Sequence, residues 1–334
     1  MGARLTAADE GEHAVGEATN WNESRYVDFW DPAQQVGGWF RIGARPNQDY
    51  AEMSACVYLP DGTVAFGFGR PTIHENVMSV GGQSWVVVDP FLLNQVDFVG
   101  EMSLLADPWA LTDPKTAFTT SAKVDVEVRL ACRSAGPDAV MGADQDHMGL
   151  IFLPGQADFH YQHLAHVVGT VRVGDRTWAV DGRGGKDHSW GPRNWHAKIY
   201  LRWLIAGIDD RHGFMLTRAV GPTKQTRSGF MLDDGELSIV DDFVMRNSYA
   251  DAPNHELKSV ELEIRSGDRR WTAMGTPRNW LPLRHRQQNE HGELATLRIV
   301  KSPTDWVLGD GRTANGHCEY HDRIEDGRPV GLHD

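Results

Sequence analysis

The stretch DGRGGKDHSWGPRNW, residues 181–195, concentrates residue types that could do chemistry within fifteen positions. Its four glycines could cradle a phosphate group through backbone N–H groups. Asp187 and His188 are adjacent and could exchange a proton with a substrate, because burial shifts the pKa of either side chain. Trp190 and Trp195 could shape an apolar cavity. The stretch therefore offers a phosphate loop, a metal site, a pocket floor or a structural turn.

The phosphate loop is the least favoured of these alternatives. Such a loop normally joins a strand to a helix, whose N-terminus faces the anion. Here Gly191-Pro192 interrupts any helix, and residues 199–208 have the pattern of a strand. The glycines therefore predict something other than nucleotide binding.

A metal site is also not expected. His160, His163 and His166 are spaced three residues apart, and Val167, Val168 and Val171 continue their segment as a strand. Side chains three apart on a strand point to opposite faces, so the three imidazoles cannot converge without a bulge. We expect no metal and no other cofactor.

The pocket floor and the structural turn both remain open. If residues 186–190 are extended, His188 and Trp190 share one face and Asp187 points the other way. In the pocket reading, His188 and Trp190 face a ligand, while Asp187 orients the loop or the imidazole. In the alternative reading, Asp187 caps backbone N–H groups, and the tryptophans belong to the core, as is usual in β-rich proteins.

The elements that must position these residues are strands. Residues 51–69, 169–182 and 259–275 each read as two apolar runs joined by a Gly-Asp or Pro-Asp-Gly turn, which is typical of hairpins. Residues 123–132 alternate valine and leucine with charged residues, and 293–300 and 317–324 complete the series. The one helical candidate is residues 89–107. We predict an all-β chain with few short helices, divided into domains 1–155 and 156–334.

Composition limits the partners. The net charge of −13, from 33 basic and 46 acidic residues, argues against a surface that follows nucleic-acid phosphates. The polar first twenty residues contain no secretory signal, and no window approaches 18 consecutive apolar residues, so no membrane insertion is expected. The three widely spaced cysteines fit a reducing compartment. We expect a cytoplasmic protein.

The residues of this central stretch also resemble a known superfamily. Asp187-His188-Ser189-Trp190-Gly191 after a glycine-rich approach is similar to the signature of carotenoid 1,2-hydratases (hydroxyneurosporene synthases) and AttH-like proteins. The early WNESRYVDFWDP and the late GHCEYHDR resemble a bacterial branch of this superfamily. The resemblance implies two lipocalin-like antiparallel β-barrel or sandwich domains in tandem, a hydrophobic ligand bound near their junction, and cofactor-free chemistry.

One departure from that superfamily affects the chemistry. AttH-like members often read Trp-Asp-Trp on the strand after the signature, where this chain has Leu201-Arg202-Trp203. An acidic proton donor on that strand would be missing, although Tyr200 could still donate. Arg202 would instead suit a phenolate, carboxylate or enolate through paired hydrogen bonds.

The sequence thus predicts a cofactor-independent lyase or hydratase that acts by general acid–base catalysis at or next to a C=C bond. The expected substrate is a hydrophobic small molecule of the terpenoid, steroid or polyaromatic class, and a homodimer is possible. The alternatives are a non-catalytic carrier of such ligands, or an isomerase or cyclase. The catalytic candidates are His188, Asp187, Tyr161 and Tyr200, and the substrate-binding candidates are Trp190, Arg193, Trp195, Arg202 and Trp203.

Overall fold

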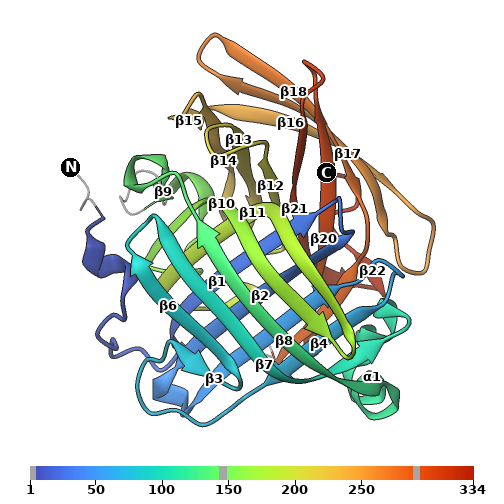
Figure 1. The fold of residues 1–334 in the computed structure, drawn as a ribbon. Helices are drawn as coiled ribbons and strands as arrows, with labels where there is room; N and C mark the ends of the chain where they lie inside the picture. Colours follow the sequence, from blue (N-terminus) through green and yellow to red (C-terminus); the bar gives the residue numbers. More distant parts are fainter. Residues whose placement is uncertain (1–4, 143–148, 289–293) are drawn as a thin grey trace.

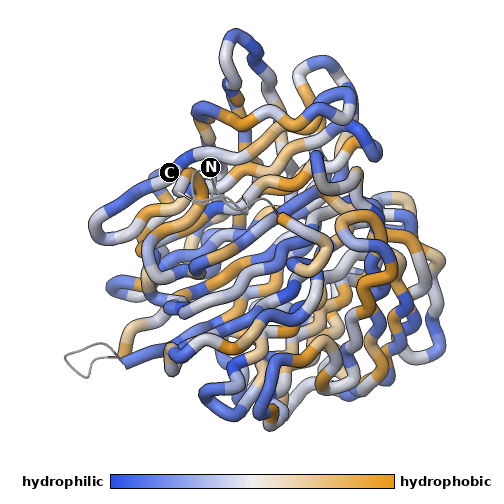
Figure 2. The backbone as a smooth tube through the Cα atoms, turned by 90° about the vertical axis from the view of Figure 1, so that its left-hand side faces the viewer, coloured by the Kyte–Doolittle hydropathy of each residue, from blue (hydrophilic) through white to orange (hydrophobic). Residues whose placement is uncertain are grey.

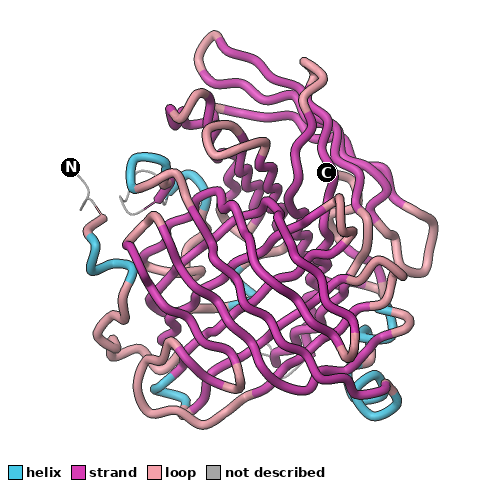
Figure 3. Tube along the Cα trace, viewed as in Figure 1, coloured by secondary structure: helices cyan, strands magenta, loops and turns pink. Residues whose placement is uncertain are grey.

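Strands make up most of the computed structural model, which describes residues 5–142, 149–288 and 294–334 (Figures 1 and 3). They form two large antiparallel sheets, so the predicted all-β class with tandem lipocalin-like halves is confirmed. The helices of the described residues are short: α1 (Pro114–Thr120), one α-helical turn at 149–151, and several 3-10 turns. Among the described residues, no helix is both long and apolar enough to span a membrane.

The first sheet closes on itself. Its hydrogen-bonded order is β4-β3-β2-β1-β11-β10-β8-β7, and β4 also pairs with β7, with Val64 opposite Leu105. Apolar side chains from these strands, such as Phe29, Phe40 and Val128, fill the interior. The strands of this sheet are β1 (Trp21–Asp31), β2 (Val36–Arg45), β3 (Tyr50–Tyr58), β4 (Val64–Gly69), β5 (Ser79–Val80), β6 (Gln83–Asp89), β7 (Leu93–Leu105), β8 (Ala122–Arg133), β9 (Met141–Gly142), β10 (Phe159–Val173) and β11 (Arg176–Pro192).

The second sheet has the order β15-β14-β13-β12-β21-β20-β18-β17-β16 and curves around its own core. Phe214, Leu262, Trp306 and Tyr320 belong to that core. The strands of this sheet are β12 (Tyr200–Gly207), β13 (Gly213–Val220), β14 (Gln225–Asp233), β15 (Glu236–Val240), β16 (Asp242–Tyr249), β17 (Leu257–Ser266), β18 (Arg269–Pro277), β19 (Leu281–Gln288), β20 (Leu294–Leu308), β21 (Thr313–Glu325) and β22 (Arg328–Pro329).

The predicted hairpins form where expected, with β3–β4, β10–β11 and β17–β18 turning at the predicted glycines. The predicted helix over residues 89–107 is wrong, because most of this segment is β7, between β6 and β8. Val96 and Phe98 are buried while Gln95 is exposed, a strand period that the neighbouring sequence obscures. Hydrophobic and hydrophilic residues alternate in the same way along many strands (Figure 2).

The glycine-rich stretch is part of a long strand, β11, and not a turn. A Cβ atom on Gly184 would lie less than 3.0 Å from the backbone oxygen of Asp28 on β1, and one on Gly185 would collide with Met215 of the second sheet. The glycines therefore let β11 lie close to β1 on one side and let the second sheet approach on the other. The first sheet continues to Pro192 and the second begins at Tyr200, downstream of the expected division at 155/156.

The two sheets pack against each other through β1, β11, β12 and β21. An apolar cluster that includes Tyr26, Trp39, Trp203 and Met215 spans this junction. A polar contact also crosses the junction between the two sheets: the Trp30 indole N–H donates to Asp305 at 2.6 Å. The junction is therefore a packed interface with its own core, separate from the interiors of the two sheets.

Candidate functional site

A cavity of about 390 Å³ lies within this junction and takes its walls from both sheets. The first sheet contributes the face of β1, β2, β3, β10 and β11 that points away from its own core, and the second sheet does the same with β12, β20 and β21. We call it the interdomain cavity. Its wall includes Tyr26, Trp39, Arg41, Glu52, Phe66, Arg70, Phe118, His160, Asp187, Arg193, Trp195, Lys198, Leu201, Trp203, Leu283, Arg284, His285, Ile299, Lys301, Glu319 and His321.

The alternation of β11 sends Asp187 into the interdomain cavity and His188 away from it. Asp187 stands opposite Tyr26 of β1, and both line the cavity. His188 stands opposite Arg25, and Trp190 opposite Glu23, on the face that points into the first sheet. His188 and Trp190 share one face, as the alternation predicts, but this face does not line the interdomain cavity. The closed first sheet, which the sequence does not reveal, decides which face is internal.

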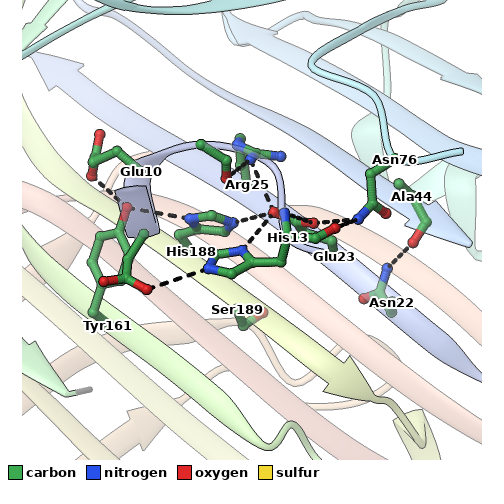
Figure 4. Close-up of polar contacts among 12 residues, drawn as sticks. Glu10, His13, Asn22, Glu23, Arg25, Ala44, Asn76, Tyr161, His188 and Ser189 are labelled. Atoms are coloured by element: carbon green, nitrogen blue, oxygen red, sulfur yellow. Dashed lines mark hydrogen bonds and ion pairs between the residues drawn. The ribbon is translucent and has the colours of Figure 1, made fainter. Parts of the chain in front are cut away.

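His188 belongs to a buried polar network under the N-terminal segment (Figure 4). Its Nε2 lies 2.9 Å from Glu23 Oε1, and its Nδ1 lies 3.3 Å from the Tyr161 hydroxyl, which donates to Glu10. His13 lies 3.1 Å from the same Glu23 oxygen. Burial, with the nearby Arg25 charge, lowers the pKa of His188 to about 4. The imidazole is therefore neutral near pH 7 and links Glu23 of β1 to Tyr161 of β10.

This network also contains the donor set best suited to a metal. Among the described residues, the ligand atoms of His13, Glu23 and His188 lie within 4.8 Å of one another. The buried Arg25 guanidinium, however, lies 3.0 Å from Glu23 Oε1 and would repel a divalent cation there. We therefore describe this set as a hydrogen-bond network. His160, His163 and His166 do not converge, since only His160 lines the interdomain cavity.

Tyr200 and Arg202 also lie outside the interdomain cavity, on the opposite face of β12 from Leu201 and Trp203. Arg202 is fully buried and donates to Asp322 at 2.9 Å and to the Gly331 carbonyl at 2.7 Å. The Tyr200 hydroxyl donates to Asp334 at 2.6 Å. Arg202, expected to bind substrate, thus lies outside the interdomain cavity, and its guanidinium anchors the C-terminal segment.

Four predicted residues do meet in the interdomain cavity: Asp187, Arg193, Trp195 and Trp203. His160 Nε2 lies 3.9 Å from Asp187 Oδ2. The Trp203 indole donates to Gln162 at 3.1 Å, and Arg193 donates to Ser189 at 2.6 Å, so both are held in place. The other predicted residues do not line the cavity and lie on the opposite faces of its strands. They are Tyr161, Tyr200, His188, Trp190 and Arg202.

Lys198 is the most informative residue that the sequence did not reveal. It follows the 3-10 turn η5 (Trp195–Ala197), is 3% exposed, and has its ammonium 4.9 Å from the Trp195 ring centroid. Burial, together with the positive charge of Arg193, lowers the pKa of Lys198 to about 7. Nothing in the sequence NWHAKIY distinguishes this lysine from an exposed one.

The sequence analysis also missed two acidic groups, Glu319 and Asp28. Glu319, on β21, is hydrogen-bonded to both Lys301 and His321 in the cavity wall. Burial raises the pKa of Glu319, but these two partners outweigh it and hold that pKa well below its usual range. The late GHCEYHDR stretch did carry this signal, because its alternation places Glu319 and His321 on one face.

Behind Tyr26, Asp28 is fully buried and accepts a hydrogen bond from the Gly185 N–H at 2.9 Å. Burial raises the pKa of Asp28 to about 7, since the Gly185 bond and the Lys301 charge only partly offset the lost hydration. Asp28, buried in the junction, and Lys198, in the cavity wall, thus both have pKa values near neutrality.

The fold and the site define a tandem lipocalin-like protein with a polar-and-aromatic cavity between its halves. The chain belongs to the family described as a domain of unknown function (DUF7064), whose model matches residues 6–324. No protein with a curated description matches the sequence.

Solved structures share the fold at low sequence identity. A putative AttH from Nitrosomonas europaea is 14% identical with a TM-score of 0.61, covering 96% of this chain and 97% of that one. CghA is 11% identical with a TM-score of 0.56, covering 93% and 90%. Kievitone hydratase from Nectria haematococca is 11% identical with a TM-score of 0.52, covering 90% and 87%. At these identities the likeness establishes the fold alone.

Proposed function

We propose that this protein is a cofactor-independent lyase or hydratase that binds a hydrophobic small molecule in the interdomain cavity. It adds or removes water, or another small fragment, at or next to a C=C bond. The observation that carries the proposal is a buried ammonium group with a pKa of about 7, placed over Trp195 in an aromatic cavity. A group that titrates near the working pH is effective in proton transfer.

The structural neighbours support this reaction class. One is a kievitone hydratase, and CghA has been crystallised with Sch210972. Both share the two-sheet fold over most of their length. A shared fold does not determine the reaction, so the residues of the cavity must carry the chemistry.

The proposed roles follow from the side chains that line the cavity. In the elimination direction, Asp187, next to His160, takes the proton from the carbon beside the departing group. The C–H electron pair forms the C=C bond, the C–O bond breaks, and protonated Lys198 converts the leaving hydroxyl to water. Hydration is the reverse. Trp195 and Trp203 hold the apolar body of the substrate and exclude water.

The test uses Lys198→Met and, as a matched control, Lys115→Met on the exposed side of α1. The ligand that copurifies is identified by native mass spectrometry and incubated with each protein in D₂O. We expect deuterium to enter carbon with wild type and Lys115→Met, and turnover to fall by about 10²–10⁴-fold in Lys198→Met.

Three outcomes of this experiment would contradict the proposal. A ligand recovered unchanged and without deuterium from wild type would identify a carrier. Equal turnover by Lys198→Met and Lys115→Met would remove Lys198 from the chemistry. A product with rearranged carbon bonds and no gain or loss of water would identify an isomerase or cyclase.

A further inference from the structure

The interdomain cavity is cationic in an acidic protein. Its wall carries six Lys or Arg side chains but three carboxylates, although the whole chain has a net charge of −13. The cations are Arg41, Arg70, Arg193, Lys198, Arg284 and Lys301, and the carboxylates are Glu52, Asp187 and Glu319.

Two of the carboxylates are already shared among several cations. Glu52 lies 3.2 Å from Arg41, 3.9 Å from Arg45 and 3.5 Å from Arg70. Glu319 is bonded by Lys301 and His321. Within the described residues, neither Arg193 nor Lys198 has a carboxylate at ion-pair distance. The unbalanced positive charge is therefore concentrated at these two residues.

Three cations surround a single indole at this end of the cavity. The charged groups of Arg41, Arg193 and Lys198 lie 5.2, 5.3 and 4.9 Å from the Trp195 ring centroid, and we call this the Trp195 cation cluster. Two buried donors in it, Arg41 Nη2 and Trp195 Nε1, have no hydrogen-bond partner among the residues that the structure describes. Buried donors are normally paired, because an unpaired one loses its hydration without compensation.

We propose that the Trp195 cation cluster is an anion subsite and that the substrate is a hydrophobic organic acid with a single carboxylate. This inference rests on the proposed function for the identity of the cavity, and it adds the substrate class. A carboxylate offers two oxygens to the unpaired arginine and indole donors. The apolar body then lies along Phe66, Phe118 and Leu283 farther along the wall.

Binding of a carboxylate in this subsite changes the protonation of Lys198. A carboxylate beside Lys198 stabilises its ammonium form, so the pKa of Lys198 rises when the acid binds. Because this pKa is about 7 in the free protein, binding at pH 8 draws a proton from solution. The bound acid thus loads Lys198 for its role as the acid in the proposed reaction.

The binding test uses pairs of probes with the same apolar body: retinoic acid and retinol, oleic acid and oleyl alcohol, and lithocholic acid and its methyl ester. Binding to the full chain is measured by quenching of tryptophan fluorescence at low salt. We expect the acid of at least one pair to bind about 10-fold or more tightly than its neutral partner. Retinyl phosphate distinguishes a carboxylate subsite from a phosphate subsite.

The variants are Arg193→Met and, as a control, Arg172→Met, whose side chain pairs with Glu127 on the surface. Arg193→Met should lose the preference for the acid and keep the affinity for the alcohol, while Arg172→Met should change neither. Calorimetry at pH 8 in two buffers of different ionisation enthalpy should show proton uptake with wild type and less with Lys198→Met.

Absence of an acid preference in every pair, including absence of binding by all probes, would overturn the anion subsite. Tighter binding of retinyl phosphate than of retinoic acid would overturn the carboxylate as the group that the subsite binds. An unchanged preference in Arg193→Met would overturn it too. These results are distinguishable from failure of the proposed reaction. An acid preference that depends on Arg193, together with no turnover of any ligand, would leave the subsite standing and contradict only the catalysis.

Discussion

The substitution Asp28→Asn should raise the free energy of unfolding above that of wild type, and this gain should be larger at pH 8 than at pH 5. Burial raises the pKa of Asp28 from 3.8 to about 7. Between these two pH values the carboxyl group is protonated in the native state and ionised in the unfolded chain. Stability therefore falls as pH rises from about 4 to 7. At about 1.36 kcal/mol per pKa unit, the ionised carboxylate costs the native state about 4 kcal/mol above pH 7.

The substitution removes this cost and retains the local geometry. An amide oxygen at position 28 can still accept the Gly185 N–H, and the amide NH₂ takes the place of Asp28 Oδ2. Part of the penalty, about 1–2 kcal/mol, is already present in wild type at pH 5. The stabilisation by Asp28→Asn should therefore grow by about 2–3 kcal/mol between pH 5 and pH 8.

The assay is urea unfolding of wild type and Asp28→Asn at several pH values, with the difference in free energy of unfolding plotted against pH. All other titrating groups are common to both proteins and cancel in the difference. Glu101→Gln, at an exposed position on β7, is the control. A flat difference, or one that decreases toward pH 8, would refute the assignment of a raised pKa to Asp28.

Three other predictions address the site and its support. Gly184→Ala should cost about 1–3 kcal/mol of unfolding free energy, because its Cβ would press on the Asp28 backbone, whereas Gly149→Ala should be close to neutral in the same urea assay. Arg202→Met should destabilise the protein by about 3–5 kcal/mol by leaving Asp322 buried without its partner; loss of ligand affinity with unchanged stability would contradict this structural role. If Lys198 acts as an acid, kcat/KM should fall as pH rises above about 7. In Lys198→Arg, whose side chain stays charged, this fall should occur at least about one pH unit higher. A fall at the same pH in both proteins would show that another group titrates.

Local pattern was enough to predict the fold class and most of the hairpins. Strand alternation and glycine turns are encoded over a few residues, so β10–β11 and β17–β18 were readable directly. Alternation also placed His188 and Trp190 on one face and Asp187 on the other. It could not say which face meets a ligand, because that depends on the pairing of β11 with β1, more than 150 residues earlier in the chain.

Other features could not be read from the sequence for the same reason. The first sheet includes β10 and β11, which lie downstream of the expected division at 155/156. Lys198 and Asp28 were not recognised because their chemistry arises from burial in the assembled junction, and neither belongs to a local motif. Arg202 was recognised as unusual for its strand, but the partner that explains it, Asp322, is 120 residues away.

The location of the interdomain cavity explains why the conspicuous signature residues are not its lining. Both sheets fill their own interiors with apolar side chains, so the only faces of β1, β11 and β12 still free to meet a ligand are those turned toward the other sheet. On β11 this is the face of Asp187 and of Gly185, whose missing side chain lets Met215 approach. On the other face, Lys186 binds Glu10 and so holds the N-terminal segment over the first sheet, while His188 binds Glu23 of β1. The signature thus serves two functions through one strand: Asp187 lines the cavity, whereas His188 and Trp190 face the interior of the first sheet and fix the strand that carries Asp187.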